Sequence, residues 1–308
     1  MKLSPLGRTD LQVHELCLGG NVFGWSANEQ ESFEVLDAYA AAGGNFIDTA
    51  DMYSSWHEGN VGGESETIIG KWMASHGNRS DIVVATKVAK HETRPGLSAA
   101  NIIAAAEDSL RRLQTDYIDL YYAHHDDETV ELEETLAAFD QLVSSGKVRY
   151  LGASNYTAPR LTQALEISRA LGLAEFTVVQ PNFNAIIRDE YQGALQDLCV
   201  TEGLAVLPYY SLAAGFLTGK YAPGVVIDSV RSDGMDDFTN ARGWAIVEAI
   251  RDIAADHNVS MSCVALEWLR AQSGIAAPIA SARTVTQLQE ILQRVTLSKS
   301  EVARISAL

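Results

Sequence analysis

The sequence predicts an α/β fold in which short buried strands alternate with amphipathic helices. Eight runs rich in β-branched or aromatic residues are separated by segments with helical periodicity. Several runs, such as residues 82–87 (IVVATK), are almost continuously apolar, as is typical of strands that are buried on both faces. The first seven runs begin at intervals of about 28 to 37 residues. This alternation predicts either a closed (β/α)₈ barrel or an open, doubly wound sheet.

The individual elements follow from these patterns in chain order. The predicted strands cover residues 16–20, 45–49, 82–87, 117–122, 148–154, 176–180, 204–209 and 276–281. The predicted helices cover residues 28–43, 63–76, 98–113, 130–145, 158–171, 188–202, 242–257, 260–272 and 284–295. Ahead of them, residues 1–13 contain two short extended stretches around Gly7, which predict a β-hairpin that would plug the N-terminal end of a barrel.

The longest connection lies between the seventh and eighth strands. Residues 212–240 fill most of it and carry Gly, Pro and Asp without clear periodicity. A loop of this length is usually functional. Neither a low-complexity segment nor an interdomain linker is visible, so we expect residues 1–308 to form a single domain.

Composition limits the classes of partner. The net charge of −17 disfavours nucleic acids and anionic membranes, so we expect neither as a partner, and a nucleotide would have to be held by local cations. Cys17, Cys199 and Cys263 are far apart in the chain and predict reduced, buried thiols in a cytoplasmic protein. We expect no signal peptide and no transmembrane helix, because the chain shows neither pattern.

Four residue types that suit carbonyl reduction follow three successive predicted strands. Asp48 lies near the end of the second strand and Tyr53 follows it, Lys87 ends the third, and His124 follows the fourth. In a (β/α)₈ barrel these strand ends share one mouth. A phenol can donate a proton, and a neighbouring ammonium is expected to lower its pKa. Asp48 would hold Lys87 in place, and His124 would hydrogen-bond the carbonyl oxygen as negative charge develops on it.

Each of these residues also has a structural explanation when it is taken alone. Asp48 and Lys87 suit a buried ion pair, Tyr53 a surface or pocket tyrosine, and His124 a core histidine. Their joint order at strand ends favours an active site. A metal site is not expected, because His124 and His125 are adjacent on a strand and therefore point to opposite faces.

The motifs together resemble the aldo-keto reductase superfamily over nearly the whole chain. The resemblance rests on Leu6-Gly7-Arg8-Thr9, Asp48-Thr49-Ala50-x-x-Tyr53, Thr86-Lys87 and Asp119-Leu120-Tyr121-x-x-His124. It implies a (β/α)₈ barrel with extra helices near the C-terminus, Tyr53 as general acid, and NADPH as cofactor. The cofactor contacts that it implies are Ser154, Asn155, Gln180, Tyr209, Leu212, Gly215, Leu217, Thr218, Gly219, Lys220, Ser281, Arg283, Gln287 and Glu290.

The chain departs from the family pattern in the hairpin, where Asp10 stands in place of a common Gly, and at two places that bear on ligand binding. His125-Asp126 stands where Trp-Pro is frequent, and Ile291 stands where an asparagine often contacts adenine. Trp56 and His125 are therefore the expected substrate contacts, and the substrate itself is expected only as a small carbonyl compound. The alternatives are an NADPH-binding redox sensor or regulatory subunit, or a nonenzymatic barrel. A monomer or a weak homo-oligomer is expected.

Overall fold

A computed structural model describes residues 3–222 and 238–308, and its centre is an eight-stranded parallel sheet. The strands are β3 (Cys17–Gly19), β4 (Phe46–Asp48), β5 (Val83–Val88), β8 (Ile118–Ala123), β9 (Val148–Ser154), β10 (Phe176–Gln180), β11 (Ala205–Val206) and β12 (Ile279–Ala280). The order in the sheet is β11-β10-β9-β8-β5-β4-β3-β12. Strands adjacent in sequence are therefore neighbours throughout the sheet, as in a parallel barrel.

Hydrogen bonds between β11 and the segment that leads into β12 close the sheet into a barrel. The Val206 N–H donates to the Gly274 carbonyl, and the Ala276 N–H donates to the Val206 carbonyl at 2.9 Å. The Ile279 N–H donates in turn to the Pro208 carbonyl. The closed form of the two predicted architectures, the (β/α)₈ barrel, is thus confirmed.

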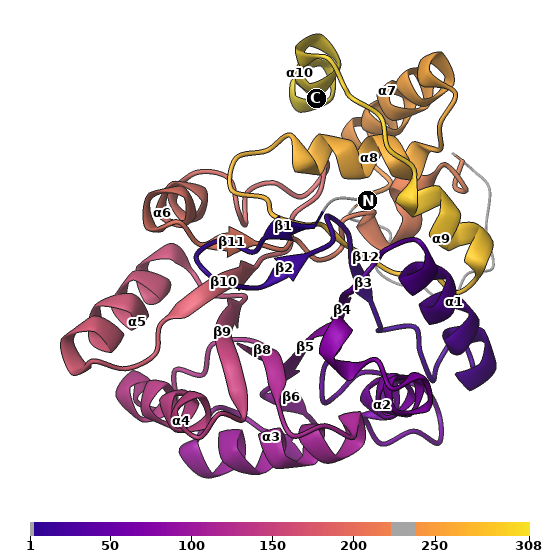
Figure 1. The fold of residues 1–308 in the computed structure, drawn as a ribbon. Coiled ribbons are helices and arrows are strands. Elements are labelled where there is room, and N and C mark those ends of the chain that lie inside the picture. Colours follow the sequence, from indigo (N-terminus) through magenta and orange to yellow (C-terminus); the bar gives the residue numbers. More distant parts are fainter. Residues whose placement is uncertain (1–2, 223–237) are drawn as a thin grey trace.

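Helices cover the outside of the barrel (Figure 1). They are α1 (Glu29–Ala41), α2 (Glu64–His76), α3 (Ala99–Leu113), α4 (Leu132–Ser144), α5 (Ala158–Leu171), α6 (Ala194–Glu202), α7 (Ala241–His257), α8 (Met261–Arg270), α9 (Val285–Leu292) and α10 (Lys299–Ser306), with short 3₁₀ turns at Arg79–Asp81 (η1) and Ala213–Thr218 (η2). None of the helices described is both long and apolar enough to cross a membrane. The extra helices near the C-terminus are confirmed.

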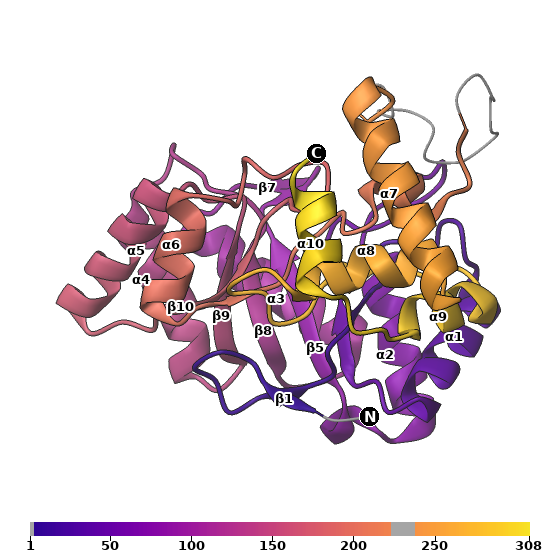
Figure 2. The ribbon, with the colours of Figure 1, turned by 90° about the horizontal axis from the view of Figure 1, so that it is seen from above.

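The N-terminal hairpin closes one end of the barrel. Strands β1 (Ser4–Pro5) and β2 (Gln12–Val13) pair in antiparallel fashion. Leu6, Leu11 and Val13 pack into the same apolar cluster as the inward-facing Phe46 and Leu120. The hairpin therefore seals the barrel interior, as predicted, and leaves the opposite end for ligands (Figure 2).

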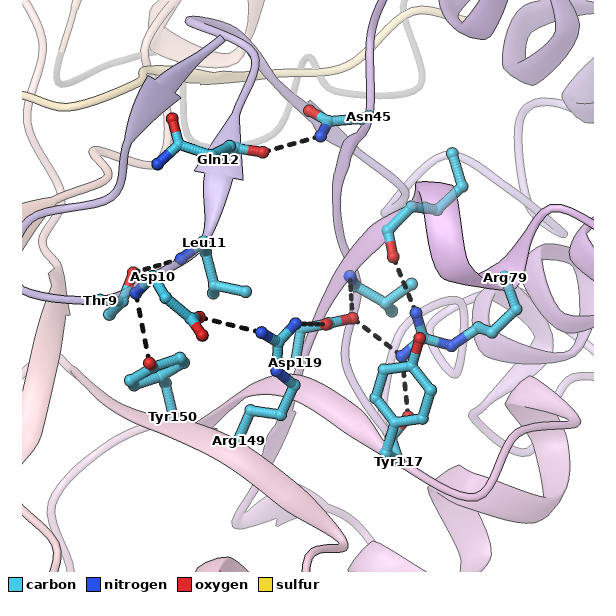
Figure 3. A network of polar contacts seen from close by, with 12 residues as sticks. Thr9, Asp10, Leu11, Gln12, Asn45, Arg79, Tyr117, Asp119, Arg149 and Tyr150 are labelled. Carbon is cyan, nitrogen blue, oxygen red and sulfur yellow. Dashed lines mark hydrogen bonds and ion pairs between the residues drawn. The ribbon is translucent and has the colours of Figure 1, made fainter.

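A network of hydrogen bonds and ion pairs connects the N-terminal hairpin to the barrel strands at the sealed end (Figure 3). Asp119 is buried and accepts hydrogen bonds from the Val84 N–H, from Arg79 and from Arg149. Arg149 also donates to Asp10 in the hairpin turn. Asp119 belongs to the same sequence motif as His124, but it lies at the opposite end of β8 and serves the structure of the barrel.

We expect Asp119→Asn to destabilise the fold. The amide keeps one acceptor oxygen where the carboxylate offered two, so at least one arginine loses its partner. Because Arg149 is partly exposed, the expected loss is about 1–2 kcal/mol in the free energy of unfolding. Denaturant titration would measure it, with the exposed Asp116→Asn as control. A midpoint equal to that of the control would contradict this role.

Several elements differ from the sequence predictions. The predicted helix over 188–202 begins only at Ala194, because Gly193 has φ 93° and ψ −129°, which breaks the helical path. The seventh and eighth strands are shorter than predicted, since Pro208 and Pro278 have no N–H for ladder bonds. A second small hairpin, β6 (Lys90–His91) with β7 (Arg94–Pro95), was not predicted and follows β5.

Candidate active site

A cavity of about 460 Å³ lies at the open, C-terminal end of the barrel. Its wall contains predicted residues from β4, β9, β10, the η2 turn, helix α9 and the loops that follow the strands. These are Asp48, Tyr53, Trp56, His124, Ser154, Asn155, Gln180, Tyr209, Leu212, Gly215, Thr218, Lys220, Ser281, Arg283, Gln287 and Glu290. The structure thus gathers most of the sequence-predicted residues around one cavity, as expected for the mouth of this fold.

Lys87 is the centre of a buried hydrogen-bonded group. Its ammonium donates to Asp48 Oδ2 at 2.6 Å, to the Thr49 carbonyl at 2.7 Å and to Tyr53 Oη at 2.8 Å. Adjacent parallel strands explain the contact, because Asp48 on β4 is paired with Ala85 on β5, and Lys87 points to the same face two residues later. Lys87 lies behind Tyr53 and Asp48 rather than in the cavity wall.

The environment of Tyr53 keeps its hydroxyl protonated. Burial raises the pKa of Tyr53 well above its ordinary value, and the Asp48 carboxylate, 3.3 Å from Oη, adds to the shift. The sequence-based expectation of a lowered Tyr53 pKa is contradicted, because burial and Asp48 raise it. Burial also lowers the pKa of Lys87. The proton therefore resides on Tyr53 before any reaction.

His124 is a neutral imidazole beside Tyr53. Burial lowers its pKa well below the ordinary value, and Lys87 and Lys90 lower it further. The two rings lie at a centroid distance of 6.0 Å, and His124 Nδ1 has no hydrogen-bond partner within the described part of the chain. A neutral histidine in the cavity wall can donate one hydrogen bond to a ligand oxygen.

The part of the cavity wall next to Asp48 consists of amide and hydroxyl side chains. Gln180 donates to Asp48 Oδ1 at 2.8 Å, and Ser154 donates to the main-chain oxygen of Gln180. Asn155 donates to the main-chain oxygen of His124 and accepts from the Tyr209 hydroxyl at 2.7 Å. The predicted carboxamide-binding residues are thus joined to the tetrad of Asp48, Tyr53, Lys87 and His124 by direct contacts.

The part of the cavity wall formed by η2, Lys220 and the segment from Arg283 into α9, which we call the far half, carries positive charge. Among the arginines that the structure describes, Arg283 is the one whose guanidinium makes no ion pair or hydrogen bond with a described residue, although its main-chain N–H donates to Gln287. Gly215 has φ 98°, and a Cβ there would lie 3.0 Å from Lys220 Nζ. Its lack of a side chain leaves room for that ammonium. An unpaired guanidinium in so acidic a protein suits an anionic ligand group.

Besides Lys87, three predicted site residues lie outside the cavity wall. Leu217 is fully buried in the hydrophobic core, and Gly219 ends the η2 turn with φ 82° against Met261. His125 is half-buried, and its Nδ1 contacts the main-chain oxygen of Asp126. Trp56, by contrast, lines the cavity and packs edge-on against Trp25 at 5.5 Å.

The cavity wall also contains residues that the sequence analysis did not name. They are Gly19, Asn21, Val22, Met52, Lys90, Tyr210, Ser211, Ala214, Ser262, Ile279 and Ala280, and Ile291, named above only as a departure from the family pattern, also lines the cavity. Several of these residues, among them Asn21, Lys90 and Tyr210, lie within three residues of the end of a predicted strand. Their place in the sequence could therefore have indicated that they lie at the barrel mouth. Ser262 belongs to α8, and no pattern in the sequence links it to the barrel mouth. No group of three or more potential metal ligands occurs in residues 3–222 and 238–308.

Asp51 is a buried acid directly behind this wall. Neither of its carboxylate oxygens has a hydrogen-bond partner among the residues that the structure describes, although its main-chain N–H donates to the Lys87 carbonyl. Burial raises the pKa of Asp51 to about 8, and the buried Glu66 carboxylate contributes. Asp51 is therefore protonated in the folded protein at neutral pH.

Asp51 should make the fold less stable as pH rises. The unfolded chain releases this proton near pH 4, whereas the folded chain keeps it until about pH 8. The folded state then binds more protons, so the free energy of unfolding falls by about 1 kcal/mol per pH unit between pH 5 and 8. Denaturant titrations of wild type and Asp51→Asn test this. Equal slopes in the two proteins would contradict it.

Comparison with known proteins decides the family. The sequence model of the Aldo/keto reductase family matches residues 15–308. The chain belongs to the aldo/keto reductase family. An "Uncharacterized oxidoreductase YrpG" of Bacillus subtilis (strain 168) is 35% identical over 97% of this chain and 92% of that protein. "Norsolorinic acid reductase B" of Aspergillus parasiticus is 34% identical over 97% and 81%.

This aldo/keto reductase is also similar to a protein with a different kind of name. A "Probable voltage-gated potassium channel subunit beta" of Oryza sativa subsp. japonica is 32% identical over 94% of this chain and 90% of that protein. The family generally binds a nicotinamide cofactor, and its named oxidoreductases support an oxidoreductase role for this chain.

Proposed function

We propose that this protein is an NADPH-dependent oxidoreductase that reduces aldehydes or ketones to alcohols, with Tyr53 as general acid. One observation carries the proposal. The Tyr53 hydroxyl lies 2.8 Å from the Lys87 ammonium, in the wall of a cavity that neutral His124 shares. A protonated phenol with an adjacent cation and a neutral hydrogen-bond donor is the set of groups that proton transfer to a carbonyl oxygen requires.

The residues of this chain divide the proton chemistry between them. The cofactor, when bound, supplies the hydride to the carbonyl carbon. His124 orients the carbonyl oxygen, and Tyr53 Oη gives that oxygen a proton, so that the alcohol is neutral. Lys87 stabilises the phenolate that remains, and Asp48 keeps Lys87 in contact with Oη.

The cavity wall fits a phosphorylated nicotinamide dinucleotide in two places. Ser154, Asn155 and Gln180 offer hydroxyl and carboxamide groups beside the tetrad, where we place the nicotinamide carboxamide. Arg283 and Lys220 supply cations at the far half, where we place the phosphates. The N-terminus of α9 follows Arg283 directly and adds partial positive charge.

The experiment is NADPH oxidation, followed by the near-ultraviolet absorbance of the cofactor, with a panel of aldehydes and ketones. The proposal expects consumption of NADPH that requires both protein and carbonyl substrate. Equilibrium binding of NADPH is measured in parallel by protein fluorescence. Failure to bind the cofactor would remove the reductase proposal.

A regulatory role is the second candidate, and the name of the rice relative favours it. In that case the protein would bind NADPH and report redox state with little turnover. Tight NADPH binding without oxidation by any carbonyl in the panel would favour this role over the reductase.

We propose that residues 1–308 form a single domain, that the protein is cytoplasmic, and that it is a monomer or a weak homo-oligomer. We propose a small carbonyl compound as substrate and no nucleic acid or membrane partner. Size-exclusion chromatography with light scattering tests the oligomeric state.

A further inference from the structure

The β6–β7 hairpin places a cation in the part of the cavity wall that contains Tyr53 and His124, which we call the catalytic end. Lys90, the first residue of β6, lines the cavity three residues after Lys87. Its ammonium makes no hydrogen bond or ion pair with any residue that the structure describes, although the protein carries a net charge of −17. Lys90 and His124 line the same cavity, and Lys90 contributes to the lowered pKa of the His124 imidazole.

Strained backbone fixes this hairpin over the barrel mouth. Ala89, directly before Lys90, is buried with φ 112°, a conformation that residues with a Cβ rarely adopt. Its carbonyl accepts a hydrogen bond from the Gly96 N–H, which closes the hairpin. Such strain is retained where the surrounding structure holds it, and it occurs frequently at ligand clamps.

The same hairpin packs against the loop that carries Trp56. Gly62 lies so close to His91 that a Cβ on Gly62 would be 2.8 Å from His91 Nε2. Trp56 is 45% exposed and Tyr210 is 50% exposed, and both line the cavity with Lys90. The catalytic end therefore offers flat apolar surfaces and one unpaired ammonium. The Asp48 carboxylate, the nearby acid of the wall, is already bound to Lys87.

We infer that the carbonyl substrate bears an anionic group, a carboxylate or a phosphate, which pairs with Lys90 while its apolar body lies against Trp56. This inference rests on the proposed reductase function. It differs from cofactor binding because the two other cavity cations, Lys220 and Arg283, belong to the far half. A free ammonium in a strongly acidic protein attracts an anion and gives no advantage to a neutral substrate of the same shape.

The test compares three aldehydes of similar shape: 4-formylbenzoate, its neutral methyl ester, and 4-formylphenyl phosphate. Wild type should prefer one or both anions over the ester, and the preferred anion identifies the group. In Lys90→Gln, kcat/KM for that anion should fall about fivefold to tenfold more than for the ester, through a higher KM. Lys90→Arg should retain the preference, and added salt should weaken it in wild type.

Lys299→Gln is the matched control, since Lys299 is an exposed lysine of α10 that does not line the cavity. It should keep the wild-type preference. Equal losses for anion and ester in Lys90→Gln would overturn the inference, as would a rise in the NADPH dissociation constant as large as the loss with the anion. Absence of turnover with all three aldehydes in wild type, despite turnover of other carbonyls, would also overturn it. Absence of turnover with any carbonyl would instead refute the reductase function itself.

Discussion

Tyr53→Phe is expected to reduce carbonyl turnover roughly 10²- to 10⁴-fold, the range that a positioned general acid contributes. The substitution removes only the hydroxyl that contacts Lys87 and Asp48, so the ring remains in the cavity wall. Without it, the oxygen that gains charge has no proton donor, and Lys87 has no phenolate to stabilise. Single-turnover oxidation of NADPH measures the chemical step directly.

Binding measurements separate this role from a structural one. The Tyr53 hydroxyl makes no hydrogen bond to the residues placed at the cofactor, so the NADPH dissociation constant should stay close to that of wild type. Tyr150→Phe is a matched control, because its hydroxyl accepts from the Asp10 N–H at the sealed end of the barrel. Near-wild-type turnover in Tyr53→Phe would show that another group donates the proton.

The order of residues along the chain was sufficient to predict the tetrad but not its protonation. Asp48, Tyr53, Lys87 and His124 were found because parallel strand ends meet at one mouth. The sign of the Tyr53 pKa shift depends on whether burial and Asp48 outweigh Lys87. That comparison needs the distances and the depth of burial, which no sequence pattern contains.

The fold was predictable where strands and helices are long and periodic. The strand over 148–154 and the helix over 158–171 have the predicted bounds. The β6–β7 hairpin was missed because each of its strands has two residues, too few for alternation to be visible. Helix α10 did have a signal, since Ser298 and Glu301 form a capping box at its start.

We expect cofactor selectivity to depend on Arg283, which the sequence analysis named and the structure places in the cavity wall. Its guanidinium has no hydrogen-bond or ion-pair partner among the residues that the structure describes, so it can bind the 2′-phosphate that distinguishes NADPH from NADH. A charge-assisted contact of this kind contributes about 2–3 kcal/mol. Arg283→Ala should therefore raise the NADPH dissociation constant roughly 30- to 150-fold.

NADH lacks the phosphate, so its affinity should change little in Arg283→Ala, and the preference for NADPH should largely disappear. Arg283→Lys keeps the charge without the planar fork and should fall between the two proteins. Arg304→Ala is the control, because Arg304 is ion-paired with Asp252 on the outer helices. An equal loss of affinity for NADPH and NADH would mean that Arg283 maintains the shape of the site and does not bind the 2′-phosphate. In that case the positive charge of Lys220, together with the N-terminus of α9, would have to account for any preference that wild type shows.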